Sequence, residues 1–247
     1  MAKKNRTRTD QVTDCACVIH SSGYDWIYVE RLHNMLNRWM PGGARLHVFT
    51  EHDRSVPPHM VKHVLEDWPG IAGPKKSWWY KIQMFNPAHH LDNFLYFDLD
   101  CVIVADLTWI TQLHTDYFWT LKDFRYLQRP SWNSMNSSVM WWNVSKFSWV
   151  WDEFNRQGHD TVIRRWPGDQ DFINATIDHN KKRYFDVKRF QSWRWQAWDG
   201  GMNFQLRKQN TPGSGTHFDP DACALVFHGQ PKPHQLPPGE LRTIWGG

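Results

Sequence analysis

The sequence predicts an α/β fold, a single domain in which a mixed, mainly parallel sheet is flanked by helices in a Rossmann-like arrangement. Two observations predict it. An apolar strand at 15–20, a helix at 26–40 and a second strand at 46–50 have the spacing of a βαβ unit. Residues 94–97 then form an apolar run with the length and composition of a strand buried on both faces.

The first helix is predicted from apolar residues that recur every three or four positions, until a Pro-Gly-Gly sequence ends the pattern. Residues 51–76 are punctuated by Pro-Pro, Pro-Gly and Gly-Pro pairs, so we expect mostly loop there, with room for one short helix. A helix at 78–85, which carries Lys81, should then lead into the central strand.

The second half of the chain is expected to add strands and helices around the same sheet. We expect, in order, a helical turn at 107–113, a strand at 117–121, a polar run at 133–137 before a strand at 138–143, helices at 146–156 and 170–178, and a strand at 224–227. Residues 191–216 show no clear period. Because no repeat, long linker or low-complexity block interrupts the chain, a single domain with elaborated loops is the simplest account.

The composition excludes several classes of protein. The 247 residues are 40% hydrophobic and 22% charged, as in a globular protein with a sizeable core. The net charge is only +4, and part of it lies in a short basic tail, residues 1–13, which we expect to be disordered. This mild excess suits a phosphorylated ligand and does not indicate a nucleic-acid partner.

Cysteine spacing and hydropathy indicate a cytoplasmic protein. The four cysteines have no C-x-x-C spacing, so we expect reduced thiols in or near the core, not disulfides or a zinc site. No apolar run reaches the length that spans a membrane, and the N-terminus lacks the apolar region of a signal peptide. We therefore expect no transmembrane segment and a cytoplasmic location.

The pattern with most chemical content follows the central strand. Asp98 and Asp100 would emerge from its end on the same side of an extended backbone. Two carboxylates so arranged can share one hard divalent cation, which in turn can hold a phosphate-bearing substrate. D-x-D is short and common, so an ordinary strand end with two solvated aspartates explains it about equally well.

Three later stretches carry groups that suit such a site. His228 and Lys232 follow a strand end, where an imidazole can bind a cation and an ammonium group can neutralise a diphosphate. Asp169, at a predicted helix start, can meet a sugar hydroxyl or a developing charge, and Asn136 and Ser137 offer short hydrogen-bonding groups. Each has an ordinary structural explanation as a surface histidine, a helix N-cap or a turn. Their order along one α/β chain is what favours a site.

This order resembles the family 8 glycosyltransferases, the group of glycogenin and the bacterial lipopolysaccharide galactosyltransferases, over most of the chain. Five segments carry the resemblance: Lys81 ahead of the D-x-D; Y-F-D-L-D at 96–100; M-N-S-S-V-M at 135–140, similar to the family's F-N-S-G-V-M; D-Q-D at 169–171; and V-F-H-G-Q-P-K-P-H at 226–234, similar to its H-F-x-G-x-x-K-P-W. No single segment is highly specific, whereas the five in this order are.

The resemblance implies the GT-A fold and the transfer of a sugar from a nucleotide-sugar donor, usually a UDP-sugar, to an unknown acceptor. It also implies Mn²⁺ or Mg²⁺ as the cofactor, retention at the anomeric carbon, a nucleotide-sugar-binding half at 14–125 and an acceptor and catalytic half at 126–247. The implied metal ligands are Asp98, Asp100 and His228. The implied donor-binding residues are His20, Ser21, Tyr24, Lys81, Asp98, Leu99, Asn136, Ser137, Gly229 and Lys232, and the implied catalytic residues are Asp169, Gln170 and Lys232.

Two departures from the family's pattern concern this site. The family's histidine lies three residues before the glycine, where this chain has Val226, whereas His228 lies one residue before Gly229. A shift of two residues keeps a side chain on the same face of a strand, about 6–7 Å away, so His228 remains the favoured third ligand. The family's glycine after Asn-Ser is Ser138 here and its final tryptophan is His234, as in a distant branch.

Other classes remain open. A sugar-nucleotide nucleotidyltransferase also combines a Rossmann-like sheet with a metal, although no Gly-rich phosphate loop with a following basic residue occurs near the N-terminus. A non-catalytic, Trp-rich carbohydrate- or nucleic-acid-binding protein would explain the 17 tryptophans, which stack on sugars and bases but more often fill cores. Within the glycosyltransferase hypothesis, Trp193, Trp195 and Trp198 are candidates for an aromatic acceptor platform.

Overall fold

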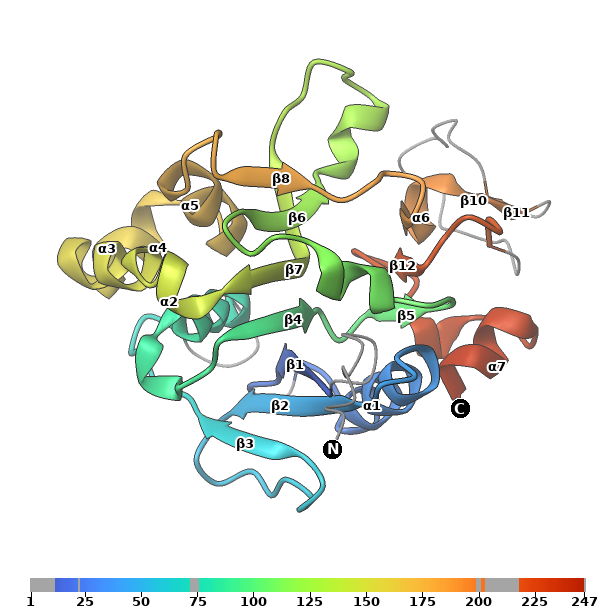
Figure 1. Ribbon diagram of the computed structural model, residues 1–247, viewed down its shortest axis with the longest axis horizontal. Helices are drawn as coiled ribbons and strands as arrows, with labels where there is room; N and C mark the ends of the chain where they lie inside the picture. Colours follow the sequence, from blue (N-terminus) through green and yellow to red (C-terminus); the bar gives the residue numbers. More distant parts are fainter. Residues whose placement is uncertain (1–11, 22, 72–75, 199–200, 203–217, 247) are drawn as a thin grey trace, which may run out of the picture.

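Seven strands form the main sheet of the structure, a computed structural model that describes residues 12–21, 23–71, 76–198, 201–202 and 218–246 (Figure 1). In chain order they are β1 (Thr13–Val18), β2 (Ala44–Thr50), β3 (Val61–Val64), β4 (Asn93–Phe97), β6 (Phe118–Lys122), β7 (Met135–Asn143) and β8 (Lys182–Tyr184). Across the sheet their order is β3-β2-β1-β4-β7-β6-β8. A three-stranded sheet contains β5 (Cys101–Ile103), β12 (Ala224–Val226) and β9 (Phe190–Ser192), and β10 (Ala197–Trp198) pairs with β11 (Gly201–Met202).

The main sheet is parallel except around β7. β1 pairs in parallel with β2 and β4, as β2 does with β3 and β6 with β8, whereas β7 runs antiparallel to both of its neighbours, β4 and β6. The unit of β1, the following helix and β2 has the predicted βαβ topology. The predicted mixed, mainly parallel sheet flanked by helices is therefore confirmed.

Helices cover both faces of the main sheet (Figure 1). The α-helices are α1 (Ile27–Trp39), α2 (Val144–Phe147), α3 (Trp149–Gln157), α4 (His159–Arg165), α5 (Asp169–Thr176), α6 (Trp193–Gln196) and α7 (Glu240–Gly246). The 3₁₀ helices are η2 (Ser77–Phe85), η3 (Pro87–His89), η4 (Thr108–Gln112), η5 (Phe124–Leu127) and η6 (Pro233–Gln235).

Side chains of the central strands alternate between two hydrophobic clusters. In β4, Leu95 and Phe97 belong to one cluster and Phe94 and Tyr96 to the other, as the two-residue period of a strand requires. The first cluster includes the apolar faces of α1 and α7, and the second includes those of η2, α3 and α5. Both faces of β4 are therefore buried, which explains its uninterrupted apolar sequence.

Most expected elements are present, and the exceptions are short or lie at an edge. The expected loop at 51–76 contains the edge strand β3, whose sequence, Val-Lys-His-Val, is half-buried and has no alternating apolar pattern. The strand β8 and the helices α4 and α7 were also not predicted. The polar run at 133–137 was expected to precede a strand, but β7 already begins at Met135, so Asn136 and Ser137 lie within the strand.

The ends of the chain and the cysteines complete the comparison with the sequence. The predicted basic tail at 1–13 lies outside the described residues except for Val12 and Thr13, and Thr13 begins β1. All four cysteines are buried and unpaired, as expected. Within the described part of the chain, none of the helices is apolar over a length that would cross a bilayer.

The second hydrophobic cluster gives a stability prediction. Trp142 is fully buried, and its ring centroid lies 4.3 Å from that of Phe94 and 4.9 Å from that of Phe85. Trp142→Ala should lower the free energy of unfolding by about 3–5 kcal/mol, because it removes a large buried side chain and leaves a cavity. Urea denaturation measures the difference. Trp149→Ala is the matched control, since 37% exposure of Trp149 predicts a loss below about 1 kcal/mol; equal losses in the two variants would contradict this account of the core.

Candidate active site

The two aspartates lie in a turn that joins the main sheet to the three-stranded sheet. β4 ends at Phe97 and β5 begins at Cys101, and the N–H of Cys101 donates to the carbonyl of Asp98 at 3.1 Å. The expected extended backbone is therefore wrong here, although both carboxylates still line the same cavity. In the turn, Asp98 meets a lysine from η2 while Asp100 meets a lysine from the C-terminal segment.

Lys81 of η2 connects Asp98 with the start of α5. Its Nζ lies 2.7 Å from Asp98 Oδ1 and 3.6 Å from Asp169 Oδ2. It also donates to Ser137 Oγ at 3.1 Å, and that hydroxyl donates to Asp169 Oδ2 at 2.8 Å. Tyr96 OH donates to Asp98 Oδ1 at 2.5 Å. One buried ammonium group thus joins side chains from the end of β4, from β7 and from α5.

Burial and charge act in opposite directions on this network. Burial alone would lower the pKa of Lys81, but the carboxylates of Asp169 and Asp98 outweigh burial, so the pKa is held above its ordinary value and the lysine stays charged. Burial would raise the pKa of Asp98, yet the charge and hydrogen bond of Lys81 lower it. For Asp169, burial prevails over the attraction of Lys81 and raises the pKa.

Asp100 is held by the N-terminal loop and the C-terminal segment together. Lys232 Nζ forms an ion pair with Asp100 Oδ2 and donates to Tyr24 OH at 2.9 Å, while Tyr24 OH donates to the same carboxylate oxygen at 2.8 Å. Lys232 Nζ also donates to the carbonyl of Phe227 at 3.3 Å. Burial raises the pKa of Asp100 despite the opposing charge of Lys232. The structure therefore brings together residues that are more than 200 positions apart in the chain.

Both aspartates and Lys81 line one cavity, of about 210 Å³, at the carboxyl ends of β1 and β4. Its walls consist of Val18, Ile19, His20, Tyr24, Ser77, Trp78, Lys81, Tyr96, Asp98, Leu99 and Asp100. The loops that follow the carboxyl ends of strands are the usual ligand sites of α/β sheets. We call this space the donor cavity, because the family resemblance implies that several of its residues bind a nucleotide-sugar donor.

Trp78 lines the cavity and was not among the residues predicted from the sequence. Its side chain is 43% exposed, and a Cβ built on Gly168 would lie 3.4 Å from its Nε1. The indole therefore stands between the D-x-D side of the cavity and the start of α5. The neighbouring Trp79 is fully buried, so only the three-dimensional structure distinguishes the exposed tryptophan from the core one.

His20 and Ser21 form the N-terminal edge of the donor cavity. The ring of His20 stacks on Tyr80 with centroids 4.0 Å apart, and its Nε2 lies 2.9 Å from Asp67 Oδ1. Ser21 adopts a left-handed conformation, with φ 61°, and its Oγ lies 2.7 Å from Nδ1 of His20. The carbonyl of Ser21 accepts from Arg54 at 2.9 Å. His20 lines the cavity directly, whereas Ser21 supports it.

Three other predicted residues lie beside the cavity, not in its wall. Asn136 Oδ1 accepts from the N–H of Ser138 at 3.0 Å, next to an irregularity in the pairing of β6 and β7. Gln170 is half-buried in the first turn of α5, directly after Asp169. Gly229 has φ 80°, a backbone conformation that other residues rarely adopt, so this position favours glycine.

The structure does not bring His228 to the aspartate pair. Its Nε2 lies 2.6 Å from Ser192 Oγ, and its ring stacks on Phe124 with centroids 5.3 Å apart. Burial, reinforced by the charges of Arg194 and Lys232, lowers the pKa of His228 to about 4, so the imidazole is neutral. The two-residue shift that was expected to leave His228 within reach of the cation instead directs it to a different contact. Within the described residues, no three His, Cys, Asp or Glu side chains are grouped so that they could hold a metal ion.

Asp98 and Asp100 fit one kind of divalent-cation site. Mg²⁺ and similar hard cations are often held by one or two carboxylates, while waters and substrate phosphates complete the coordination shell. Two carboxylates of the same turn, both lining the donor cavity, match that donor set. They do not match a site built from three protein ligands, because the third predicted ligand is bound elsewhere.

The predicted acceptor platform is wrong for two of its three tryptophans. Trp193 is fully buried and stacks on Phe227 with centroids 5.3 Å apart. Trp195 is 8% exposed, and its ring and that of His228 are in edge-to-face contact. Both residues therefore belong to the core beneath the C-terminal segment. The side chain of Trp198 lies outside the described residues.

Comparison with known proteins identifies the fold. No protein-family model matches the chain, and no curated protein matches its sequence. Among solved structures, an active-site mutant of LgtC superposes with a TM-score of 0.63 at 10% identity, covering 94% of each chain. The galactosyltransferase LgtC in complex with donor and acceptor sugar analogs gives 0.59 at 12% identity, covering 90% of this chain and 89% of that one. The glycosyltransferase GlyE of Streptococcus pneumoniae TIGR4 gives 0.55 at 15% identity, covering 96% of this chain and 59% of that one.

This likeness extends over nearly the whole chain, so the protein has the fold of these glycosyltransferases. The GT-A fold predicted from five short segments is confirmed. At 10–15% identity the likeness concerns the fold, and the chemistry has to be argued from the residues of this chain.

The buried lysine gives a prediction with a defined pH dependence. Lys81→Met should lower the free energy of unfolding by about 3–5 kcal/mol near pH 7, because it leaves buried carboxylates without their cation. Without Lys81 the pKa of Asp169 rises further, so the folded variant binds more protons than the unfolded chain above pH 4. Its stability therefore falls as pH rises from about 4 to 7, more steeply than that of the native protein.

Urea denaturation at pH 5 and pH 7 measures both effects. Lys146→Met is the matched control, since the ion pair of Lys146 with Asp116 is exposed and such pairs contribute little. A Lys81→Met protein whose stability and pH profile follow those of Lys146→Met would contradict the central role given to Lys81.

Proposed function

We propose that this protein is a glycosyltransferase whose donor is a nucleoside-diphosphate sugar, with a UDP-sugar as the first candidate, and which works with Mn²⁺ or Mg²⁺. The observation that carries the proposal is the donor cavity, where a D-x-D turn lies between two lysines from distant parts of the chain. The fold supports it, since the galactosyltransferase LgtC has been solved on the same fold with donor and acceptor sugar analogs.

The two lysines would have different tasks in the reaction. Lys232 is only partly buried and its side chain is long and flexible. Its ammonium group can therefore exchange its contact with the Asp100 carboxylate for a contact with a phosphate. Lys81 is almost fully enclosed by Asp98, Asp169 and Ser137, so it would fix these groups and would not follow the substrate. We therefore assign diphosphate binding to Lys232 and positioning to Lys81.

Asp98 and Asp100 would hold the divalent cation together with phosphate oxygens of the donor. When bound, that cation supplies positive charge against the diphosphate as the bond to the sugar breaks. In the transfer, the bond between the anomeric carbon and the diphosphate oxygen would break, a bond to an acceptor hydroxyl oxygen would form, and the hydroxyl proton would pass to the leaving diphosphate. Lys232 would stabilise the charge that builds up on the leaving nucleoside diphosphate.

The start of α5 would bind the sugar. Asp169 is fixed by Ser137 and Lys81 and can accept a hydrogen bond from a sugar hydroxyl, while Gln170 follows it in the first helical turn. By the family resemblance, Gln170 would lie near the anomeric carbon and the transfer would retain the anomeric configuration. We assign no general base, because a retaining transfer does not require one from the protein.

The role of the aspartates is tested by an isosteric change. Asp100→Asn should lower kcat/KM for UDP-sugar hydrolysis or transfer by about 100-fold or more, because it weakens cation binding and removes the ion pair with Lys232. Chelation with EDTA should abolish the activity of the native protein, and added Mn²⁺ should restore it. Asp106→Asn, at an exposed position six residues later, is the matched control and should keep native activity.

Unchanged turnover in Asp100→Ala would contradict the proposed metal site. Release of pyrophosphate from a nucleoside triphosphate and a sugar phosphate would instead identify a nucleotidyltransferase. A thermal-shift screen reports donor identity directly, since a nucleotide sugar at 100 times its Kd stabilises the folded state by about 2.7 kcal/mol.

Trp78 gives an independent test of the donor cavity. Stacking of an aromatic side chain on a base contributes about 1–3 kcal/mol, so Trp78→Ala should weaken donor binding by roughly 10-fold or more. Trp78→Phe should retain most of the affinity, because it keeps a ring in the wall. Isothermal titration with a UDP-sugar and Mn²⁺ measures the affinities, and native binding by Trp78→Ala would exclude the indole from the site.

A further inference from the structure

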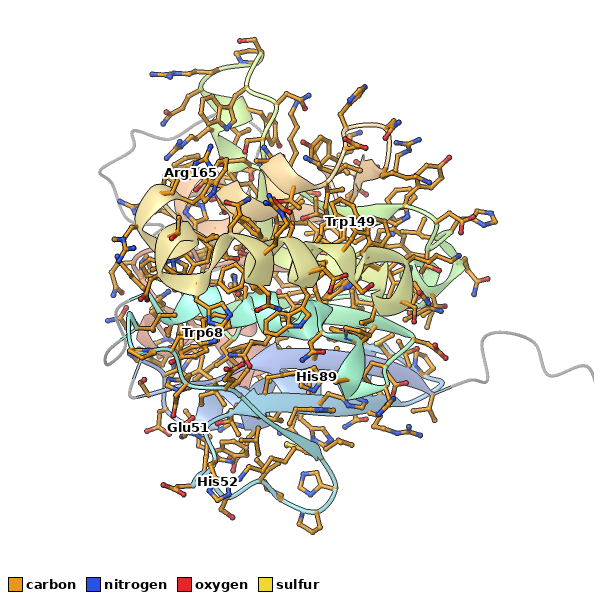
Figure 2. The ribbon with its side chains drawn as sticks, turned by 90° about the vertical axis from the view of Figure 1, so that its left-hand side faces the viewer. Glu51, His52, Trp68, His89, Trp149 and Arg165 are labelled. Atoms are coloured by element: carbon orange, nitrogen blue, oxygen red, sulfur yellow. The ribbon has the colours of Figure 1, made fainter. Side chains whose placement is uncertain are left out.

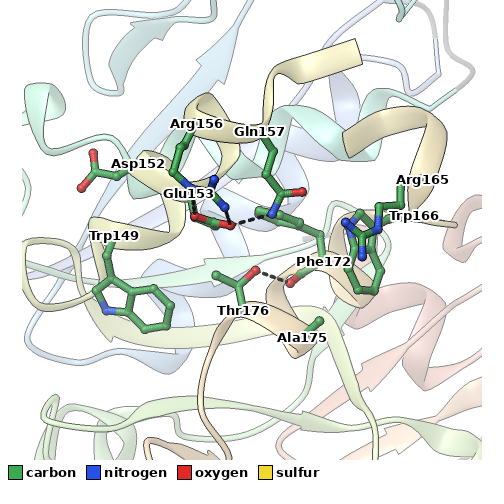
Figure 3. Close-up of a pocket in the computed structure, with 10 residues that line it drawn as sticks. All are labelled: Trp149, Asp152, Glu153, Arg156, Gln157, Arg165, Trp166, Phe172, Ala175 and Thr176. Atoms are coloured by element: carbon green, nitrogen blue, oxygen red, sulfur yellow. Dashed lines mark hydrogen bonds and ion pairs between the residues drawn. The ribbon is translucent and has the colours of Figure 1, made fainter. Parts of the chain in front are cut away.

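A second cavity lies away from the donor cavity. It has a volume of about 530 Å³ and runs between α3, the end of α4 and α5 (Figure 3). Its size lies within the range of small-molecule sites. None of the residues assigned to the donor, the metal or catalysis lines it. It lies on the helical face of the molecule that Figure 2 presents, where Trp149 and Arg165 are labelled.

A tryptophan stands at each end of this cavity. Figure 3 shows Trp149 at one end and Trp166, beside Arg165, at the other. Trp149 is 37% exposed; among the described residues the other tryptophan with a comparably exposed side chain is Trp78, which the donor cavity explains. An indole left open to solvent in a groove offers a flat apolar face, and its N–H remains available as a donor.

Trp149 also lines a further cavity, of about 470 Å³, together with Asp116, Lys146 and Lys181. The two cavities therefore adjoin at one indole, and we call them together the Trp149 groove. A groove with an aromatic side chain in its middle suits an elongated ligand better than a compact one.

The charges of the larger cavity are balanced. Glu153 receives hydrogen bonds from Arg156 and from Gln157, each at 2.6 Å, so its carboxylate and the guanidinium group satisfy each other. Asp152 and Arg165 are the other two charged residues of the wall. Two acidic and two basic side chains cancel in the larger cavity, and in the other cavity Lys146 pairs with Asp116, so Lys181 leaves the groove one positive charge in excess. One positive charge is a weak basis for selecting a phosphate or a sulfate. Hydrogen-bonding groups with little net charge, beside an open indole, instead suit hydroxyl groups and apolar C–H faces.

We propose that the Trp149 groove binds an uncharged oligosaccharide. Sugar hydroxyls both donate and accept, and so match carboxylate, amide and guanidinium groups, while the C–H face of a sugar ring packs on Trp149. Trp166 lines the groove, and Gly168, two residues later, touches Trp78 of the donor cavity. The segment between them leads directly into Asp169. The proposal that the groove binds an oligosaccharide does not depend on the proposed function, whereas the use of the groove to hold an acceptor chain rests on it.

Binding of neutral and charged probes tests the proposal. We would titrate the full chain with maltohexaose, cellohexaose and chitohexaose, and with a heparin hexasaccharide as the anionic probe, by isothermal titration. At least one neutral probe should bind, and Trp149→Ala should weaken that binding at least 10-fold while Trp149→Phe keeps most of it. Ala175→Arg, at an exposed position in the groove, should block binding by bulk without removing any contact.

Trp78→Ala is the matched control, because it removes the other exposed indole and should bind the hexasaccharide as the native protein does. Failure of all neutral probes, binding of heparin alone, or native affinity in both Trp149→Ala and Ala175→Arg would overturn the proposal. UDP-sugar hydrolysis separates the two hypotheses: Trp149→Ala should hydrolyse like the native protein. Oligosaccharide binding without hydrolysis would refute only the transferase, and hydrolysis without oligosaccharide binding would refute only the groove.

Discussion

A single buried ammonium group, that of Lys81, connects the parts of the candidate active site. Lys81 projects from η2, and its partners are Asp98 at the end of β4, Ser137 in β7 and Asp169 at the start of α5. A charge in such a position is costly to bury unless it is paired and hydrogen-bonded, and here two carboxylates and a hydroxyl surround it. The arrangement of these three elements therefore depends on one side chain, and the distance between the D-x-D turn and the D-Q-D helix start depends on it too.

The second lysine makes the site depend on the completed fold. Lys232 reaches Asp100 because β12 pairs with β5, the strand that begins right after the D-x-D turn. The N–H of Phe227 donates to the carbonyl of Asp100 at 3.1 Å, so backbone pairing brings the C-terminal segment to this aspartate. Contacts between residues 24, 100 and 232 close long loops, and closing such loops has an entropic cost. The pairing of Lys232 with Asp100 thus depends on the three-stranded sheet.

How far the sequence predicts this molecule follows from the range of each interaction. The helix at 27–39 and the strands at 44–50 and 93–97 could be predicted, since periodicity and apolar composition act locally. β3 and β8 could not, because these short edge strands gain most of their stability from pairing with a neighbour. The sequence predicts the two aspartates as a pair. It does not predict that Asp98 pairs with Lys81 and Asp100 with Lys232, because the two lysines come from separate parts of the chain. The prediction that His228 lies near the cation is wrong for a similar reason. A two-residue shift keeps a side chain on the same face only while the backbone stays extended. β12 ends at Val226, so His228 lies beyond the strand and contacts Ser192.

The charges around the donor cavity connect the proposed cation with the proposed donor. When all are ionised, Asp98, Asp100 and Asp169 carry one negative charge more than Lys81 and Lys232 neutralise. Burial already acts against this excess, because it raises the pKa of both Asp100 and Asp169. A diphosphate entering the same space would add further negative charge at short range, where repulsion is strong in a partly buried site. Two lysines that are already paired cannot balance it alone. A divalent cation held by the D-x-D turn and the diphosphate would remove most of that excess, which is the physical reason for including a metal in the proposed function.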